Sequence, residues 1–180
     1  TGGWAGPSGC SRNPGRGAGS GSKCHAKRGT VTTDAAVSLL VEDNTNDVML
    51  LKRAFSKAGA RGTLRSVTDG DAAVAYLAGE GIYGDRELYP VPHLLLLDLK
   101  LPRRSGHEVL GWLRARENLK RIPVIMLTSS REREDIDRAY DLGANSYLVK
   151  PMGFDELMAM VRSLDGYWME WNDGPEVQSA

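Results

Sequence analysis

Four short apolar runs in the chain each end at polar residues. They are residues 38–41, followed by Glu42 and Asp43; 94–97, followed by Asp98; 124–127, followed by Thr128; and 147–149, followed by Lys150 and Pro151. Continuous apolar runs that are separated by room for a crossover helix are typical of parallel strands buried on both faces. Because ligands of such sheets bind beyond the carboxyl ends of the strands, these polar residues are expected to converge on one small pocket.

The segments between the runs carry helical patterns. Helices are expected over residues 46–58; from a cap at Thr68-Asp69 through Leu77; after Gly106 through Leu113, ending before Pro123; and over about 131–142. A last helix is expected from near Gly153 until Gly174-Pro175, with Leu157, Val161, Leu164, Trp168 and Trp171 at helical spacing. A weaker strand is expected at 63–67, and residues 79–92 form a longer loop. Five strands then alternate with five helices. Right-handed crossovers favour a three-layer α/β sandwich for this pattern.

Length and composition agree with one compact domain. The chain has 180 residues with 41% hydrophobic content, and no apolar stretch approaches the roughly 20 residues that span a bilayer. Residues 37–180 carry 18 basic against 22 acidic residues, which argues against a nucleic-acid-binding surface on the folded part. The only cysteines, Cys10 and Cys24, support neither a disulfide framework nor a zinc site. A reducing, cytoplasmic location is expected.

Residues 1–36 differ in composition from the rest. They are rich in Gly, Ser and Arg, and Trp4 is the only large hydrophobic residue before Val31. Such a segment cannot bury enough apolar surface to offset its ordering entropy, so a disordered extension is expected. A basic tether or a targeting peptide is the functional alternative. The folded domain is expected over 37–172, with a short flexible tail at 173–180.

The polar residues at the strand ends suggest metal-dependent phosphate chemistry. Glu42, Asp43 and Asp98 would repel one another at close range unless one is protonated or a divalent cation neutralises them. A site with oxygen ligands and without His or Cys favours Mg²⁺. With the Lys150 ammonium and the Thr128 hydroxyl, such a site would hold phosphoryl oxygens. Asp98 is centrally placed to act as the nucleophile.

Four motifs, in order, resemble the receiver domain of bacterial two-component response regulators. They are residues 39–44 (Leu-Leu-Val-Glu-Asp-Asn), 97–102 (Leu-Asp-Leu-Lys-Leu-Pro) with Gly106, 127–129 (Leu-Thr-Ser), and 143–151 (Gly-Ala-Asn-Ser-Tyr-Leu-Val-Lys-Pro). The resemblance covers about residues 37–171. Residues 47–55, the loop before Pro92, residues 120–123 and the aromatic end at 167–171 further resemble the stand-alone regulators associated with phytochromes.

The resemblance implies a role for each site residue and a flavodoxin-like sheet of order 2-1-3-4-5. Asp98 would accept a phosphoryl group from a sensor histidine kinase, for which a bacteriophytochrome is a candidate. Mg²⁺ would be bound by Asp43, by Asp98, by Glu42 through water, and by the backbone carbonyl of Lys100. Thr128 and Lys150 would bind the phosphoryl oxygens, and Tyr147 would change rotamer when Thr128 moves. The Lys150-Pro151 bond would be cis. The domain would be a signalling domain that catalyses its own phosphotransfer and dephosphorylation, rather than an enzyme.

Simpler interpretations exist for the same residues. Glu42 or Asp43 could cap a helix, Thr128 could bond locally, and Lys150 could be a solvated lysine. Tyr147 could be ordinary core. The histidines at 93 and 107 are expected to be structural or surface residues, and the arginines at 103 and 104 to form a solvated turn.

Two other classes of protein are alternatives to the receiver domain. A phosphatase with an aspartate nucleophile would need a second aspartate where Lys100 stands. A flavin or nucleotide carrier would need glycines and backbone N–H groups where the strand ends are acidic.

The end of the chain bears on how a signal would leave the domain. Nine residues follow Trp171, too few for a DNA-binding output domain, so protein contacts are expected. A symmetric homodimer through the fourth helix, fifth strand and fifth helix is a candidate assembly. Lys100 departs from phytochrome-associated relatives, which often have a neutral residue there, and it puts the phosphoryl lifetime in question.

Overall fold

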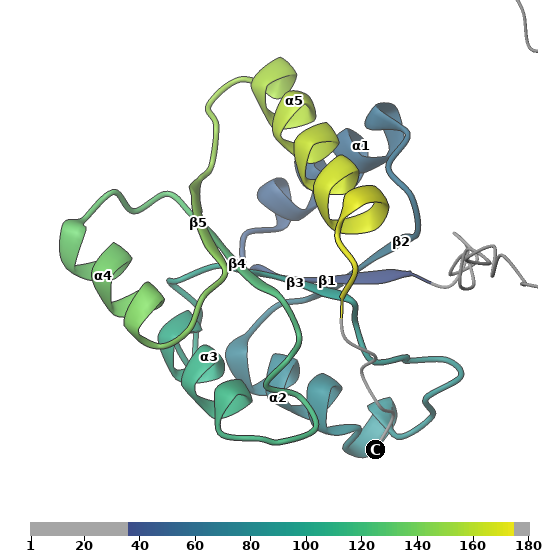
Figure 1. The fold of residues 1–180 in the computed structure, drawn as a ribbon, viewed down its shortest axis with the longest axis vertical. Helices are drawn as coiled ribbons and strands as arrows, with labels where there is room; N and C mark the ends of the chain where they lie inside the picture. Colours follow the sequence, from purple (N-terminus) through teal and green to yellow (C-terminus); the bar gives the residue numbers. More distant parts are fainter. Residues whose placement is uncertain (1–35, 175–180) are drawn as a thin grey trace, which may run out of the picture. The chain divides into compact units, whose positions relative to one another are not determined.

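The computed structural model describes residues 36–174, which form a parallel sheet covered by helices on both faces (Figure 1). Its elements are β1 (Val37–Val41), α1 (Thr45–Ala58), β2 (Thr63–Val67), α2 (Gly70–Ala78), the 3₁₀ helix η1 (Gly81–Tyr83), β3 (Leu94–Leu97), α3 (Gly106–Arg114), β4 (Val124–Thr128), α4 (Arg133–Asp141), β5 (Ser146–Val149), α5 (Phe154–Asp165) and the π-helical segment η2 (Gly166–Trp171). The five strands are parallel in the order β2-β1-β3-β4-β5. The expected three-layer α/β fold and strand order are confirmed.

Two hydrophobic clusters cover the two faces of the sheet. Leu39, Leu95 and Met126 point to the face covered by α2, α3 and α4, whereas Leu40, Leu96 and Ile125 point to the face covered by α1 and α5. Consecutive residues of a strand point to opposite faces, so the continuous apolar runs fill both clusters. Figure 1 shows α1 and α5 together on one side of the sheet and α2 and α3 on the other. Strands β1, β3 and β4 are buried along their whole length, which makes the sheet a rigid base for their carboxyl ends.

The end of the last helix differs from the expected single amphipathic helix. The α-helix ends at Asp165 and continues as π-helix, in which the Asn172 N–H donates to the Tyr167 carbonyl five residues back. The wider turn moves Trp171 away from the core-facing stripe, and its side chain is 78% exposed. Helical spacing placed Trp171 in line with Trp168, but of these two residues only Trp168 packs partly buried against the core.

Some expected boundaries fall outside the described part of the chain. The extension at 1–36 and the tail at 173–180 lie outside it, apart from residues 36, 173 and 174. Within 36–174, no helix has the length and apolar character needed to cross a membrane. The expected cytoplasmic location stays a prediction.

Candidate functional site

The strand ends place Glu42 and Asp98 next to each other at the carboxyl edge of the sheet. The Glu42 N–H donates to the Val67 carbonyl at 3.0 Å, and the Asp98 N–H donates to the Val41 carbonyl at 3.0 Å. These bonds continue the β1–β2 and β1–β3 ladders by one residue and fix both backbones. Both residues are buried, at 1% and 6% exposure. Each carboxylate therefore stands at the end of an apolar strand with little access to water.

Asp43 completes a cluster of three carboxylates. One oxygen from each of Glu42, Asp43 and Asp98 lies within 4.8 Å of the others. At that separation, two full charges repel by roughly 3–4 kcal/mol at an effective dielectric constant of about 20. The helix-cap interpretation of Glu42 and Asp43 is wrong, because Asn44 caps α1 by accepting from the N–H groups of Asn46 and Asp47. Capping by Asn44 leaves all three carboxylates available to the pocket.

Lys150 supplies the cation of this site. Its Nζ donates to Glu42 Oε2 at 2.5 Å, to Asp47 Oδ2 at 2.9 Å and to Asp98 Oδ2 at 3.2 Å. Its backbone N–H donates to the Thr128 carbonyl at 2.9 Å, which ties it to the end of β4. The side chain is 14% exposed, so the solvated-lysine interpretation is wrong.

The peptide bond after Lys150 corrects a second expectation. Residues 36–174 contain no cis peptide bond, so Lys150-Pro151 is trans and the expected cis bond is wrong. The trans form of a bond before proline is favoured by about 0.5–1 kcal/mol. With this bond trans, Lys150 contacts the carboxylates of Glu42, Asp47 and Asp98.

Burial and ion pairing act in opposite directions on the pKa values of Glu42 and Lys150. Burial raises the pKa of Glu42, and the hydrogen bond and charge of Lys150 only partly oppose this. For Lys150, burial alone would lower the pKa, but the hydrogen bonds to Glu42 and Asp47 and the charge of Asp98 outweigh it, and the pKa is raised. Lys150 therefore stays charged at neutral pH and holds the carboxylates together.

Thr128 and Tyr147 lie on the neighbouring strands β4 and β5. Thr128 is 1% exposed, and its hydroxyl accepts from the Ser130 N–H at 3.3 Å, so Thr128 does bond locally, as the simpler interpretation expects. The Tyr147 hydroxyl donates to the Ser130 carbonyl at 3.2 Å, and its ring packs against the core. Both side chains thus contact the segment between β4 and α4. A movement of that segment would therefore change the hydrogen bonds of both residues.

Sequence reasoning missed Asp47 as a member of the site. Asp47 lies in the first turn of α1, where an acidic residue is usual because it interacts favourably with the helix dipole. Its contact with Lys150 comes from a residue 103 positions away, and no local pattern marks it. The one signal in the sequence is the spacing of Asp47 from Asn44, because the first turn of a helix that begins after Asn44 brings Asp47 back toward the strand ends.

The remaining residues singled out from the sequence lie around the site. Lys100 is exposed in the loop after β3. Arg103 and Arg104 form more than a solvated turn, since they pair with Asp69 at 3.5 Å and Asp71 at 3.3 Å.

His93 and His107 both have backbone partners. His93 Nδ1 accepts from the Val37 N–H at 3.3 Å. His107 is buried, and its Nε2 lies 3.2 Å from the Asp135 carbonyl oxygen. Their expected structural role agrees with these contacts.

The donor set fits a hard divalent cation. The cluster offers only oxygen atoms, and its carboxylates outnumber the single ammonium, so the pocket keeps a negative charge that a cation would neutralise. No His or Cys takes part in the cluster, which argues against zinc or copper.

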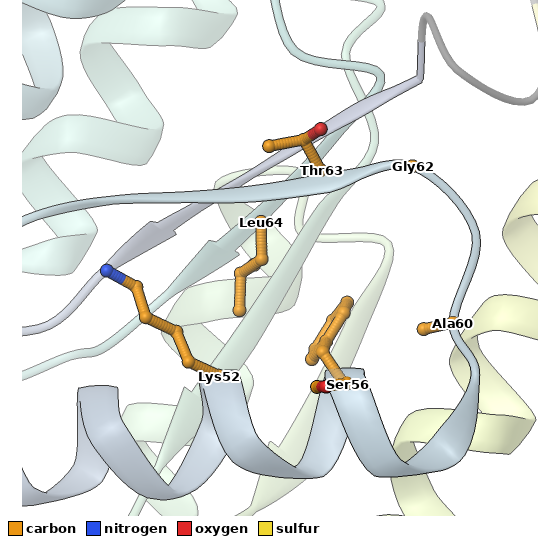
Figure 2. Close-up of a pocket in the computed structure, with 7 residues that line it drawn as sticks. Lys52, Ser56, Ala60, Gly62, Thr63 and Leu64 are labelled. Atoms are coloured by element: carbon orange, nitrogen blue, oxygen red, sulfur yellow. The ribbon is translucent and has the colours of Figure 1, made fainter.

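A separate cavity of about 290 Å³ lies between α1 and β2 (Figure 2). It is lined by Lys52, Phe55, Ser56, Ala60, Gly62, Thr63 and Leu64. Figure 2 shows Leu64 pointing toward α1 and Thr63 pointing to the other side of the strand, as alternation along β2 requires. The lining contains no carboxylate and shares no residue with the acidic cluster. The acidic cluster is therefore the candidate functional site.

Comparison with known proteins assigns the class. Residues 38–162 match the family model of the response regulator receiver domain, and the chain belongs to this family. Receiver domains are signalling domains that bind a divalent metal.

Particular relatives narrow the class further. The chain is 44% identical over 143 residues to a probable methanogenesis regulatory protein, FilR2, of Methanothrix harundinacea, a match that covers 79% of this chain and 89% of that protein. It is 39% identical over 134 residues to the response regulator Rcp1 of Synechocystis, a match that covers 74% of this chain and 89% of Rcp1.

Solved structures agree with this class. The phosphorylated cyanobacterial phytochrome response regulator RcpA has a TM-score of 0.73 and 35% identity, with 78% of this chain and 99% of RcpA covered. A Mn²⁺-bound form of Rcp1 has a TM-score of 0.70 and 38% identity, with the same coverage. The phytochrome-associated regulators are therefore among the structural neighbours of this chain, as the sequence motifs indicated.

Proposed function

We propose that this chain accepts a phosphoryl group on Asp98 from a sensor histidine kinase, in a Mg²⁺-dependent reaction, and passes the signal on through protein contacts. The observation that supports this most is the position of Lys150, whose ammonium bonds to Asp98 and Glu42 beside the three-carboxylate cluster. One pocket thereby holds a nucleophile, a cation that can bind a phosphoryl oxygen, and ligands for a metal. Kinship with Rcp1 and RcpA makes a phytochrome-type kinase the first candidate partner.

Each residue has a chemical task in this proposal. A carboxylate oxygen of Asp98 attacks the phosphorus of a phosphohistidine, the P–O bond forms, and the P–N bond breaks as the histidine nitrogen takes up a proton. The Lys150 ammonium and the Thr128 hydroxyl bind the phosphoryl oxygens. Asp43, Asp98, the carbonyl of Lys100 and, through water, Glu42 would hold Mg²⁺, which when bound neutralises charge on the phosphoryl oxygens.

The same residues make a switch. When the phosphoryl group is bound, the Thr128 hydroxyl gives up its bond to the Ser130 N–H and turns toward the new oxygens. The segment between β4 and α4 then changes its contacts with Tyr147, whose hydroxyl already bonds to the Ser130 carbonyl. Phosphorylation thus biases the surface formed by α4, β5 and α5.

A direct experiment tests the proposed function. The purified chain is incubated with a small-molecule phosphodonor, with Mg²⁺ or with a chelator, and its mass is measured. A mass increase of one phosphoryl group that requires Mg²⁺ is the expected result. A chain that gains no mass in either condition would contradict the proposal.

Lys100 is expected to set the lifetime of the phosphorylated state. Its exposed side chain follows Asp98 by two residues, where its charge would attract the phosphoryl oxygens and cover the approach of water. We expect Lys100→Asn to speed autodephosphorylation about threefold, which corresponds to roughly 0.7 kcal/mol in activation free energy. Decay of the phosphoprotein, followed by mass after removal of the donor, measures this. Arg121→Asn, at the opposite edge of the sheet, is the control, and identical decay in both variants would reject the idea.

We further propose a symmetric homodimer through α4, β5 and α5, extended by η2. Exposed aromatic side chains lie on these elements, with Tyr140 at 51%, Tyr167 at 56% and Trp171 at 78% exposure. The surface of α4 carries both signs of charge, in residues such as Arg133, Asp137 and Arg138. A two-fold dimer covers apolar area and can place opposite charges together, and β5 is an edge strand that a partner would cover.

Sedimentation of the unmodified and the phosphorylated protein tests this dimer. We expect a larger dimer fraction after phosphorylation and its loss in the double variant Tyr167→Glu/Trp171→Glu. Ile82→Glu is the matched control, because Ile82 is 74% exposed on η1, away from the proposed surface. A monomer in every state, or a dimer that neither change affects, would contradict the proposal.

A further inference from the structure

The loop after Asp98 contains a strained backbone turn. Arg103 has a φ of 66° and is the one non-glycine residue within 36–174 with a positive φ. The Arg104 N–H donates to the Pro102 carbonyl at 2.9 Å, two residues back. A hydrogen bond of this span around a residue with positive φ defines the rare hand of the γ-turn. Such a conformation costs on the order of 1–3 kcal/mol and persists only where neighbouring structure holds it.

The first turn of α2 is the neighbouring structure that holds this turn. Asp69 caps α2 by accepting from the Ala72 N–H at 2.8 Å, and it also pairs with Arg103. Asp71 pairs with Arg104. Between them, the backbone of Gly70 is so close to the loop that a Cβ atom there would lie 2.0 Å from the Arg104 carbonyl oxygen.

The close approach at Gly70 matters more than the ion pairs. The side chains of Arg103 and Asp71 are 66% and 49% exposed, and exposed ion pairs contribute only about 0–1 kcal/mol. A side chain at position 70 would instead have to displace backbone, which is costly because the loop is packed. The glycine therefore decides how near α2 and the loop can come.

The loop between Asp98 and α3 is fixed at both of its ends. The Gly106 N–H donates to the Leu99 carbonyl at 2.9 Å and closes the loop at its base. A Cβ on Gly106 would lie 2.2 Å from the Asp98 carbonyl oxygen, and Ser105 forms a capping box with Glu108 at the start of α3. Only residues 100–104 lie between these anchors, and Lys100, whose carbonyl is a proposed metal ligand, is one of them.

We infer that the first turn of α2, residues 69–71, is a positioning element for the phosphoacceptor loop. By holding the strained turn at Arg103, it sets the orientation of the Lys100 carbonyl and thereby the affinity of the site for a divalent cation. Residues 69–71 do not touch the reacting atoms. This inference rests on the proposed function for the identity of the Lys100 ligand.

Gly70→Ala tests the inference, with Gly111→Ala as the matched control. Gly111 lies in α3, and a Cβ there would meet only Leu142 Cδ2 at 3.8 Å, an ordinary contact. We expect Gly70→Ala to weaken Mn²⁺ binding by about tenfold or more, as changes to groups that orient metal ligands do, and Gly111→Ala to leave it unchanged. In the metal-free full chain, amides of residues 99–105 should exchange with deuterium faster in Gly70→Ala only.

A purely structural role would give a different result. It would lower the melting temperature of Gly70→Ala while leaving the Mn²⁺ dissociation constant and the exchange of residues 99–105 as in the unmodified chain, and this outcome overturns the inference. Arg103→Gly is a second variant that keeps the fold, since glycine adopts a positive φ without strain. We expect it to be as stable as the unmodified chain or more so, but to bind Mn²⁺ severalfold more weakly, because glycine also lets the turn adopt other conformations and removes the ion pair with Asp69. Unchanged binding in Arg103→Gly also overturns the inference.

Failure of the proposed function would be recognised separately. If the unmodified chain bound no Mn²⁺, or bound it equally well after Asp43→Ala, the acidic cluster would not be the metal site and both proposals would fall. If the unmodified chain binds Mn²⁺ through the cluster and Gly70→Ala binds it equally well, only the role of α2 is rejected.

Discussion

Replacing Asp98 with Asn is expected to abolish phosphorylation of the chain by a small-molecule donor, with a loss of at least about a thousandfold in rate. An amide has no anionic oxygen to attack phosphorus, and it brings no charge to the metal ligands. The fold should be retained, because the amide oxygen can still accept from the Leu99 N–H, which lies 2.7 Å from Asp98 Oδ1. Loss of one of three clustered carboxylates also relieves repulsion in the metal-free protein.

The mass of the intact protein after incubation with donor and Mg²⁺ measures this effect. Asp155→Asn is the control, since Asp155 is an exposed acidic residue in the first turn of α5, outside the acidic cluster. Fragmentation of the phosphorylated protein should place the modification on Asp98. An undiminished mass increase in Asp98→Asn, or a modification on another carboxylate in the unmodified chain, would show that Asp98 is not the phosphoacceptor.

The position of Asp98 could be predicted because the strand before it is entirely apolar. Residues 94–97 are four leucines, and such a run must be buried on both faces, so the first polar residue after it marks the carboxyl edge of the sheet. The same reasoning placed Glu42 after β1 and Thr128 at the end of β4. Because the strands pair in parallel, their carboxyl ends lie at the same edge of the sheet, and this could be predicted without knowing the loop conformations.

Features that depend on contacts between distant segments could not be predicted. The bond from Lys150 to Asp47 joins residues 103 apart, and the strained turn at Arg103 depends on how closely α2 approaches it. The change from α- to π-helix at Gly166 exposes Trp171, although helical spacing put it with the core residues. In each case, packing between elements decides the outcome, whereas the sequence pattern describes each element alone.

Lys150→Met is expected to separate metal binding from phosphorylation. The ammonium and a divalent cation compete for Glu42 and Asp98, since Lys150 bonds to both carboxylates. Without the ammonium, the pocket is more negative, and Mn²⁺ should bind equally well or severalfold more tightly. Phosphorylation should nevertheless slow by about 100-fold or more, because the cation that stabilises the developing phosphoryl charge is gone.

The same variant should become dependent on metal for its stability. Removing one partner of a fully buried ion pair lowers the free energy of unfolding by about 3–5 kcal/mol. Because this pocket is partly hydrated, we expect a smaller loss of about 1–3 kcal/mol when a chelator is present. A bound divalent cation restores about 2.7 kcal/mol at a concentration 100 times its dissociation constant. Urea unfolding of Lys150→Met with chelator and with Mg²⁺ measures both effects, and Lys52→Met, which removes an exposed lysine of α1, should show neither. Loss of a competing cation alone cannot weaken metal binding. If Mn²⁺ affinity and the phosphorylation rate both fell in Lys150→Met, the result would therefore show that Lys150 maintains the shape of the site rather than binding the phosphoryl group.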